Sequence, residues 1–477
     1  RGCRSRCTFC FYPRTQSALR LASPAEVGAL LTELGRRGAR EVSFLDPTFN
    51  HRPDFEPLLD ALRRGSVDAS GLAALSPLDG EQTADLISKL RAKKFIVASS
   101  DEDDQQLRSV QEQYLGHPTV AVMYLLVTDA CNLSCAYCFV RNNMASGYST
   151  AKMTSELATQ AVRFFARQVR LSGVAEPQVI FYGGEPLLNL PAVHAAVETI
   201  QTLKETSDLP RATQMTIITN GTRVTPDIAR FLKAQDMTAV VSLDGPEEIT
   251  SPLRLHGTDA LYKDIVRGLE YLQAEGVRVG ISCTLGDASL ERFDAVLKWI
   301  HASGVQSVGF NIARPIPPFQ LSLDYAEKVA DALIRGYESL TAAGINEDRM
   351  GRKVRSFVEG RPYPFDCAGC GNQIVVSPTG KVGLCAGFLG TGEYFVADVH
   401  DEAFDHASDP SFQTWSRRSP LATEECLTCP AVGCCGGGCP YSVKVRTGDL
   451  HAIDRVFCAH AKKTLEYLIW SLYERLP

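Results

Sequence analysis

Three cysteines that follow one apolar segment constrain this chain more than any other feature. In the stretch VTDACNLSCAYCF, residues 127–139, Cys131, Cys135 and Cys138 come directly after the apolar run Val122–Val127. A strand that ends in such a loop presents its side chains where α/β barrels place their chemistry. A 4Fe–4S cube takes four thiolates, so three leave one iron open, as catalytic zinc sites keep one position open. The alternative is a structural zinc knuckle with a distant fourth ligand.

Composition sets broader limits. The 477 residues suffice for two to four domains at roughly 100–200 residues each. A net charge of −6 gives no electrostatic reason to expect nucleic acid or an anionic membrane as a partner. No apolar run approaches the roughly 20 residues that span a bilayer, and no signal peptide opens the chain. Because the chain begins with Arg1 rather than Met, we expect a fragment or a processed product.

The sixteen cysteines fall mostly into tight groups separated by long spans without cysteine. Disulfide frameworks belong to short secreted domains, so this distribution favours metal ligands in a reducing cytoplasm. Cys283 stands alone in an apolar run and is expected to be a small buried hydrophobe.

From residue 120 the pattern alternates between strands and helices, which predicts an α/β fold with a parallel βα array. The expected strands are Val122–Val127, Gln178–Tyr182, Met215–Thr219, Ala239–Leu243, Val277–Thr284 and Val305–Ile312. The expected helices are Ser155–Leu171, Pro191–Lys204, Pro226–Gln235, Asp259–Ala274, Leu290–Ala302 and Tyr325–Ala342.

Two further loops carry polar groups at strand ends. FYGGEP, residues 181–186, follows the second strand; its glycines allow close backbone approach and its glutamate suits an ammonium group. SLDG, residues 242–245, follows the fourth strand, and Arg254 lies twelve residues beyond Ser242. A hydroxyl and a forked guanidinium together suit a carboxylate, although Arg254 could also be an ordinary surface arginine.

These loops, in this order, are similar to those of radical S-adenosylmethionine (SAM) enzymes, whose core is an open, partial (β/α)6 barrel. The resemblance implies that Cys131, Cys135 and Cys138 hold a 4Fe–4S cluster whose open iron binds the amino and carboxylate groups of SAM. The residues that it assigns to SAM are Tyr137 beside the adenine, Gly183, Gly184 and Glu185 at the amino group, and Ser242 and Arg254 at the carboxylate. Arg254 lies in TSPLR, which departs from the usual pattern of the family.

A cysteine-rich C-terminal region resembles the SPASM auxiliary-cluster domain of radical SAM peptide maturases. The resemblance implies two further 4Fe–4S clusters, three in all, whereas two four-thiolate zinc sites have the same stoichiometry. The nearer cluster would take Cys367, Cys370, Cys385 and Cys439. The farther cluster would take Cys426, Cys429, Cys435 and Cys458, with Cys434 adjoining Cys435. At the opposite end of the chain, Cys3, Cys7 and Cys10 in GCRSRCTFCFYP resemble the start of a second, truncated radical SAM core, which leaves open whether they hold a cluster.

The expected domains are a truncated radical SAM-like segment (1–64), a linker and helical cap (65–118), a radical SAM core (119–322), a connecting helix (323–365) and the SPASM domain (366–477). The resemblance implies that a deoxyadenosyl radical takes hydrogen from a residue of a ribosomally made precursor peptide. A flavodoxin or ferredoxin would donate electrons. One alternative is an anaerobic sulfatase-maturing enzyme, but those enzymes carry an Asp where this chain has Ala386. The other alternative is a non-catalytic tandem scaffold.

Overall fold

The computed structural model describes residues 100–144, 149–255, 261–315 and 322–473, together with Glu81, Ala84 and Ser88. The chain forms two compact units, residues 1–110 and residues 111–477. Helix α6, Ser100–Tyr114, begins with an acidic run. The predictions for Cys3, Cys7 and Cys10 lie outside the described residues, and the domain boundaries stay predictions. Within the described part of the chain, no helix is both long and apolar enough to cross a membrane.

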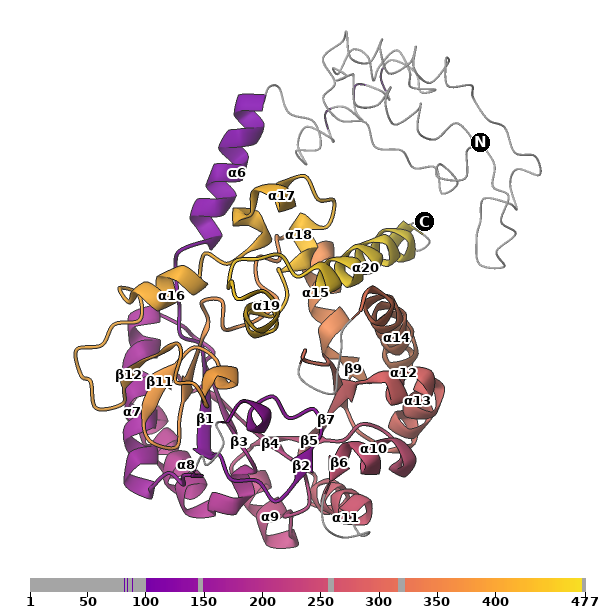
Figure 1. The fold of residues 1–477 in the computed structure, drawn as a ribbon. Coiled ribbons are helices and arrows are strands. Elements are labelled where there is room, and N and C mark those ends of the chain that lie inside the picture. Colours follow the sequence, from indigo (N-terminus) through magenta and orange to yellow (C-terminus); the bar gives the residue numbers. More distant parts are fainter. Residues whose placement is uncertain are drawn as a thin grey trace. The chain divides into compact units, whose positions relative to one another are not determined.

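The second unit is built on one ten-stranded sheet, ordered β12-β11-β10-β1-β3-β4-β5-β7-β8-β9 (Figure 1). Six consecutive members of this sheet are parallel, which confirms the predicted α/β array. They are β1 Val122–Thr128, β3 Gln178–Gly183, β4 Gln214–Thr219, β5 Thr238–Ser242, β7 Arg278–Leu285 and β8 Ser307–Ile312. Because they are parallel, their C-terminal ends meet at one edge, and the loops predicted to carry chemistry leave from that edge.

The connecting helices begin and end where local chemistry allows. Thr154 caps the first by accepting the Leu157 N–H, and Gly173 ends it in the left-handed region at φ 64°. Arg292 separates two short helices where one was predicted from Leu290. The helices are α7 Ser155–Ser172, α8 Leu190–Glu205, α9 Pro226–Ala234, α10 Glu247–Leu253, α11 Leu261–Ala274, α12 Asp287–Glu291, α13 Phe293–Ala302 and α14 Leu323–Ala342.

The cysteine-rich region joins the same sheet, which the sequence did not indicate. Its strand β10, Gln373–Val376, pairs in parallel with β1, and β11, Lys381–Gly383, and β12, Phe395–Asp398, continue the sheet antiparallel. At the opposite edge, β9, Asn346–Glu347, pairs with β8. The remaining helices are α15 Asp348–Val358, α16 Pro410–Trp415, α17 Glu424–Leu427, α18 Val432–Cys435, α19 Pro440–Thr447 and α20 Arg455–Tyr473.

Candidate active site and cysteine groups

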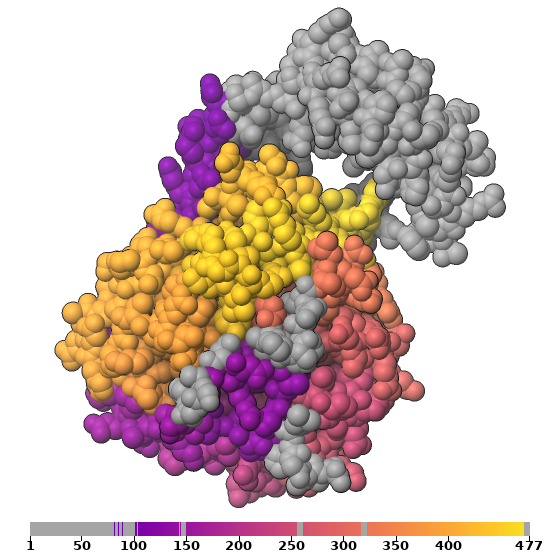
Figure 2. All heavy atoms as spheres, in the orientation of Figure 1, coloured from indigo at the N-terminus to yellow at the C-terminus, as the bar shows by residue number. Residues whose placement is uncertain are grey.

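The loop after β1 carries the core triplet at the sheet edge. Cys131 is exposed, whereas Cys135 and Cys138 are half-buried. Cys135 lies in β2, Ser134–Cys135, which pairs with β6, Arg254–Leu255, so that Cys135 faces Arg254 across the ladder. Figure 2 shows atoms of the indigo segment that follows β1 at the surface, between the yellow and orange C-terminal region and the pink barrel helices. The first thiol is therefore accessible, while the loop that carries it is anchored.

The two glycines of FYGGEP, Gly183 and Gly184, let this segment pack closely against the backbone of the triplet loop. A Cβ atom on Gly183, where φ is 139°, would lie 2.0 Å from the Thr128 carbonyl oxygen. A Cβ atom on Gly184 would lie 2.2 Å from the Ala130 carbonyl oxygen. The Gly184 N–H donates to Thr128 over 2.9 Å, and the Glu185 N–H donates to Ala130 over 2.9 Å. Only glycine permits this contact with the root of the triplet loop.

Glu185 lies fully buried behind the triplet. Its carboxylate accepts hydrogen bonds from the Thr219 hydroxyl (2.7 Å), the Asn220 N–H (2.7 Å) and the Leu187 N–H (3.1 Å). Burial raises the pKa of Glu185 to about 7, although these donors oppose the shift. The Asn220 side-chain amide in turn lies 3.9 Å from the Cys131 sulfur. Glu185 thus supports the triplet from behind.

Asp244, in the SLDG loop, ties the triplet loop to two strands. It is 0% exposed and accepts from Tyr137 Oη (2.6 Å), from Arg254 Nε (2.8 Å) and Nη2 (3.2 Å), and from the Thr284 N–H (2.9 Å). Arg254 is 4% exposed. The alternative that it is an ordinary surface arginine is therefore wrong, because its guanidinium is buried in a bidentate ion pair with Asp244. Ser242 ends β5 and pairs with Ser282.

The assignment of the eight auxiliary cysteines to two clusters stays a prediction, and the electrostatic interactions among their thiols agree with it. Burial and the neighbouring Cys439 thiol raise the pKa of Cys367 to about 11, and burial with Cys439 and Cys367 also raises the pKa of Cys385. Burial and the Cys367 thiol raise the pKa of Cys370, which is 1% exposed. These four thiols therefore lie close enough to influence one another.

The farther group forms around α17, α18 and α20. Burial and the thiols of Cys426 and Cys429 raise the pKa of Cys458, and burial raises the pKa of Cys435 to about 12, with a contribution from Cys458. The adjoining Cys434 is buried and its Sγ lies 3.6 Å from the Ala431 carbonyl oxygen. Cys283 is 0% exposed in β7, as predicted.

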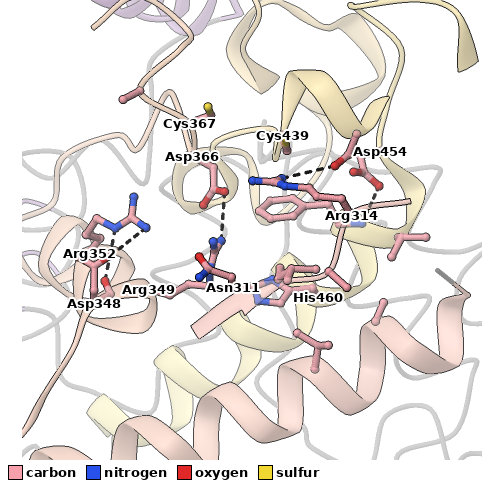
Figure 3. Close-up of a pocket in the computed structure, with 18 of the residues that line it drawn as sticks. Asn311, Arg314, Asp348, Arg349, Arg352, Asp366, Cys367, Cys439, Asp454 and His460 are labelled. Atoms are coloured by element: carbon pink, nitrogen blue, oxygen red, sulfur yellow. Dashed lines mark hydrogen bonds and ion pairs between the residues drawn. The ribbon is translucent and has the colours of Figure 1, made fainter. Parts of the chain in front are cut away.

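A cavity of about 540 Å³ lies between barrel strands and the nearer group (Figure 3). Tyr124 and Ile180 line it from β1 and β3, and Cys367 and Cys439 line it from the nearer group. Tyr124 makes an edge contact with Tyr182 at 5.8 Å between ring centroids. Burial raises the pKa of Tyr182, and the Cys138 and Cys385 thiols contribute to the rise. Tyr182 therefore lies near both the triplet loop and the nearer group.

Charged side chains of the cavity wall were not found from the sequence. Arg349 pairs with Asp366 (3.3 Å) and Arg352 with Asp348 (3.2 Å), as Figure 3 shows. Arg314 lies 5.7 Å from the Phe139 ring centroid, and its Nη1 lies 3.4 Å from the Ser442 hydroxyl. Three thiols of the nearer group, those of Cys439, Cys367 and Cys385, act electrostatically on Arg314 and raise its pKa. A half-buried guanidinium near thiols suits an anionic iron–sulfur cluster. In the described residues, no three His, Cys, Asp or Glu side chains gather around a point as a single metal ion requires.

The sequence model of the Radical SAM superfamily matches residues 1–97 and 125–300, more than half of the chain. The chain belongs to the radical SAM superfamily. This confirms the family prediction and, with it, a 4Fe–4S cluster and SAM as cofactors. The match to residues 1–97 agrees with the predicted second radical SAM-like segment.

This radical SAM protein has relatives of known activity. It is 22% identical to the radical SAM cyclopropyl synthase TigE of Paramaledivibacter caminithermalis, over 86% of this chain and 88% of the relative. It is also 22% identical to a cysteine-type anaerobic sulfatase-maturating enzyme of Clostridium perfringens, over 68% and 89%. The fold resembles anSMEcpe with bound AdoMet (TM-score 0.63, 19% identity, 74% and 98% covered) and Streptococcus suis SuiB bound to its precursor peptide SuiA (0.52, 15%, 92% and 93%).

Proposed function

We propose that this chain is a radical SAM peptide maturase that acts on a ribosomally made precursor peptide in the cytoplasm. The observation that carries the proposal is a cavity of about 540 Å³ that residues of β1 and β3 line together with Cys367 and Cys439 of the nearer group. Such a cavity can admit a peptide side chain beside a cofactor site. The similarity to TigE and to peptide-bound SuiB supports a peptide substrate.

In this proposal the triplet, Cys131, Cys135 and Cys138, holds the SAM-binding cluster. When SAM is bound there, its reductive cleavage would supply a 5′-deoxyadenosyl radical that takes hydrogen from the peptide. Glu185 and Asp244 keep the loop in place through the hydrogen bonds described above. The residues proposed to contact SAM are Tyr137, Gly183, Gly184, Ser242, Glu185 and Arg254.

The nearer and farther groups would hold two auxiliary clusters, as in a SPASM domain. Both groups supply four thiols, which is full ligation for a cube. Burial raises the pKa of most of these thiols, so cluster assembly would release protons and the bound iron would stabilise the thiolates. A flavodoxin or ferredoxin is the proposed electron donor.

The test uses anaerobically reconstituted protein with dithionite and SAM. We expect about twelve iron per chain from three cubes, release of deoxyadenosine, and mass loss in a short precursor peptide encoded beside the protein. Zinc with negligible iron would contradict the cluster assignment. Iron without deoxyadenosine would instead favour the non-catalytic scaffold.

Sulfatase maturation is the second candidate, because a sulfatase-maturating relative covers 68% of the chain. Against it, Ala386 stands where those enzymes carry a base. Ala386 is 7% exposed and packs with Leu126, Val140 and Val375. Its methyl side chain cannot accept a proton. A sulfatase-motif peptide should therefore yield no formylglycine when SAM is cleaved. Trapping an aldehyde with a hydrazide probe, above an alanine-substituted peptide, would favour this candidate instead.

A further inference from the structure

A buried lysine on α15 lacks a hydrogen-bond partner. Lys353 is 0% exposed, and its Nζ atom finds no acceptor. The Phe457 ring lies under it, with 4.9 Å between Nζ and the ring centroid. A cation–π contact offsets only part of the cost of removing an ammonium group from water. Burial lowers the pKa of Lys353, so a further negative charge nearby is needed to keep this side chain charged.

The carboxylate near Lys353 is already shared. Asp366 is the first anionic group in the field of Lys353, but its Oδ2 lies 3.3 Å from Arg349 Nη1. Arg349 also acts on Lys353, with the same sign of charge. Positive charge thus exceeds negative charge around this carboxylate.

The other neighbours of Lys353 are thiols. Its helix α15 packs against α18, which carries Cys434 and Cys435, and both thiols lie in the field of Lys353. Cys435 belongs to the farther group through Cys458. The nearer group has a different cation, Arg314, whose strongest thiol neighbours are Cys439, Cys367 and Cys385.

We propose that Lys353 is the buried counter-charge of the 4Fe–4S cluster on Cys426, Cys429, Cys435 and Cys458, and that it raises the reduction potential of this cluster. The inference rests on the proposed auxiliary clusters. A cube with four thiolates carries net negative charge, and reduction adds one more. Net charge and hydrogen bonds to the sulfurs set such potentials, so a fixed ammonium group favours the reduced form.

The experiment is an EPR-monitored potentiometric titration of the full reconstituted chain. In Lys353→Met, the ratio of reduced to oxidised farther cluster at a fixed potential should fall about tenfold, which is 59 mV for one electron. Lys353→Arg should keep most of the wild-type ratio. The matched control is Lys463→Met, because Lys463 forms an ion pair with Asp331 on a partly exposed face. The Cys426→Ser variant identifies the signal of the farther cluster.

Equal potentials in Lys353→Met and wild type, with full iron content, would overturn the inference and leave the proposed function intact. Absence of auxiliary iron in wild type would overturn both. A second measurement covers the apoprotein, where Lys353→Met should unfold at no lower denaturant concentration than wild type, since it removes an uncompensated buried charge. Clear destabilisation of the apoprotein would assign Lys353 a structural role and contradict the inference.

Discussion

Cys131 of the core triplet is exposed, whereas Cys370 of the nearer auxiliary group is 1% exposed. The triplet lies within a single loop of the barrel edge, and backbone and side-chain groups of neighbouring strands hold that loop. The auxiliary thiols come from distant parts of the C-terminal region, and the cations Arg314 and Lys353 lie near them. The triplet has one exposed thiol and the nearer group has one buried thiol, whereas the other thiols of both sites are half-buried.

The difference matches the two tasks that iron–sulfur sites perform. A site that binds a substrate or cosubstrate needs an open position, and a closed site with full ligation does not. The open loop cannot rely on burial for its geometry, so it depends on residues such as Gly184, Asp244 and Glu185. The comparison can be tested by breaking each support in turn.

The largest effect is expected from removing the triplet itself. Replacing Cys131, Cys135 and Cys138 with alanine should abolish deoxyadenosine release and leave about eight of about twelve iron atoms per chain. Cys283→Ala is the control, because this buried cysteine lies in β7 outside all groups, and it should keep both iron and turnover. Persistent turnover in the triple variant would place the chemistry elsewhere in the chain.

Gly184→Ala should remove the core cluster alone. The added methyl group would lie 2.2 Å from the Ala130 carbonyl oxygen, and backbone cannot yield as a flexible side chain does. We expect loss of about four iron atoms per chain and, by overpacking, a cost of about 1–3 kcal/mol in the free energy of unfolding. Gly433→Ala has open space around the new methyl group and should leave both values near wild type. Full iron in Gly184→Ala would mean that the loop tolerates displacement.

Asp244→Asn should weaken the fold as well as the site. The substitution leaves the buried Arg254 guanidinium without its counter-charge, which costs about 3–5 kcal/mol. Chemical denaturation of the apoprotein measures this cost without contributions from iron. The matched control is Asp208→Asn, which breaks the exposed pair with Arg170 (2.9 Å) and should cost less than about 1 kcal/mol. Equal costs for the two substitutions would contradict the role given to Asp244.

The parallel array was predictable because its signals are local. Apolar runs such as that of β1 and helix starts such as Pro226 identify elements within a few residues. The short strands β10 to β12 escaped, since three or four residues carry no readable periodicity and Val122 meets Gln373 only in the folded chain. Tertiary pairing, not propensity, makes these residues strands.

The candidate site also has features that could be predicted from the sequence and features that could not. The resemblance to the SPASM domain assigned the cysteines to two groups, because spacing alone would have placed Cys439 with its neighbours Cys435 and Cys458. Spacing could not find partners at long range, and so Arg254 was left with a surface alternative although Asp244 buries it. Arg314 and Lys353 gave no signal at all, since a basic residue is usually exposed. Only the packing of α15 and the end of β8 against the cysteine loops reveals them.

The last comparison concerns two buried glutamates, one at the core site and one remote from it. Burial raises the pKa values of both Glu185 and Glu347 from 4.5 to about 7. Between pH 4.5 and pH 7 the folded chain therefore binds more protons than the unfolded chain, so stability falls as pH rises through this window. Each shift corresponds to about 3 kcal/mol. Glu185→Gln and Glu347→Gln should each flatten the pH profile of apoprotein unfolding by a comparable amount.

Iron content then separates the two glutamates. Glu347 caps α15 by accepting from the Arg349 N–H (3.0 Å) and the Met350 N–H (2.7 Å), so Glu347→Gln should keep the core cluster. Glu185 accepts from Asn220, whose amide reaches Cys131. A glutamine at position 185 has one acceptor oxygen for the three donors that the carboxylate now satisfies, and we expect partial loss of core iron. If both variants kept full iron, Glu185 would be a stability residue like Glu347, and the support of the open loop would come from Gly184 and Asp244 alone.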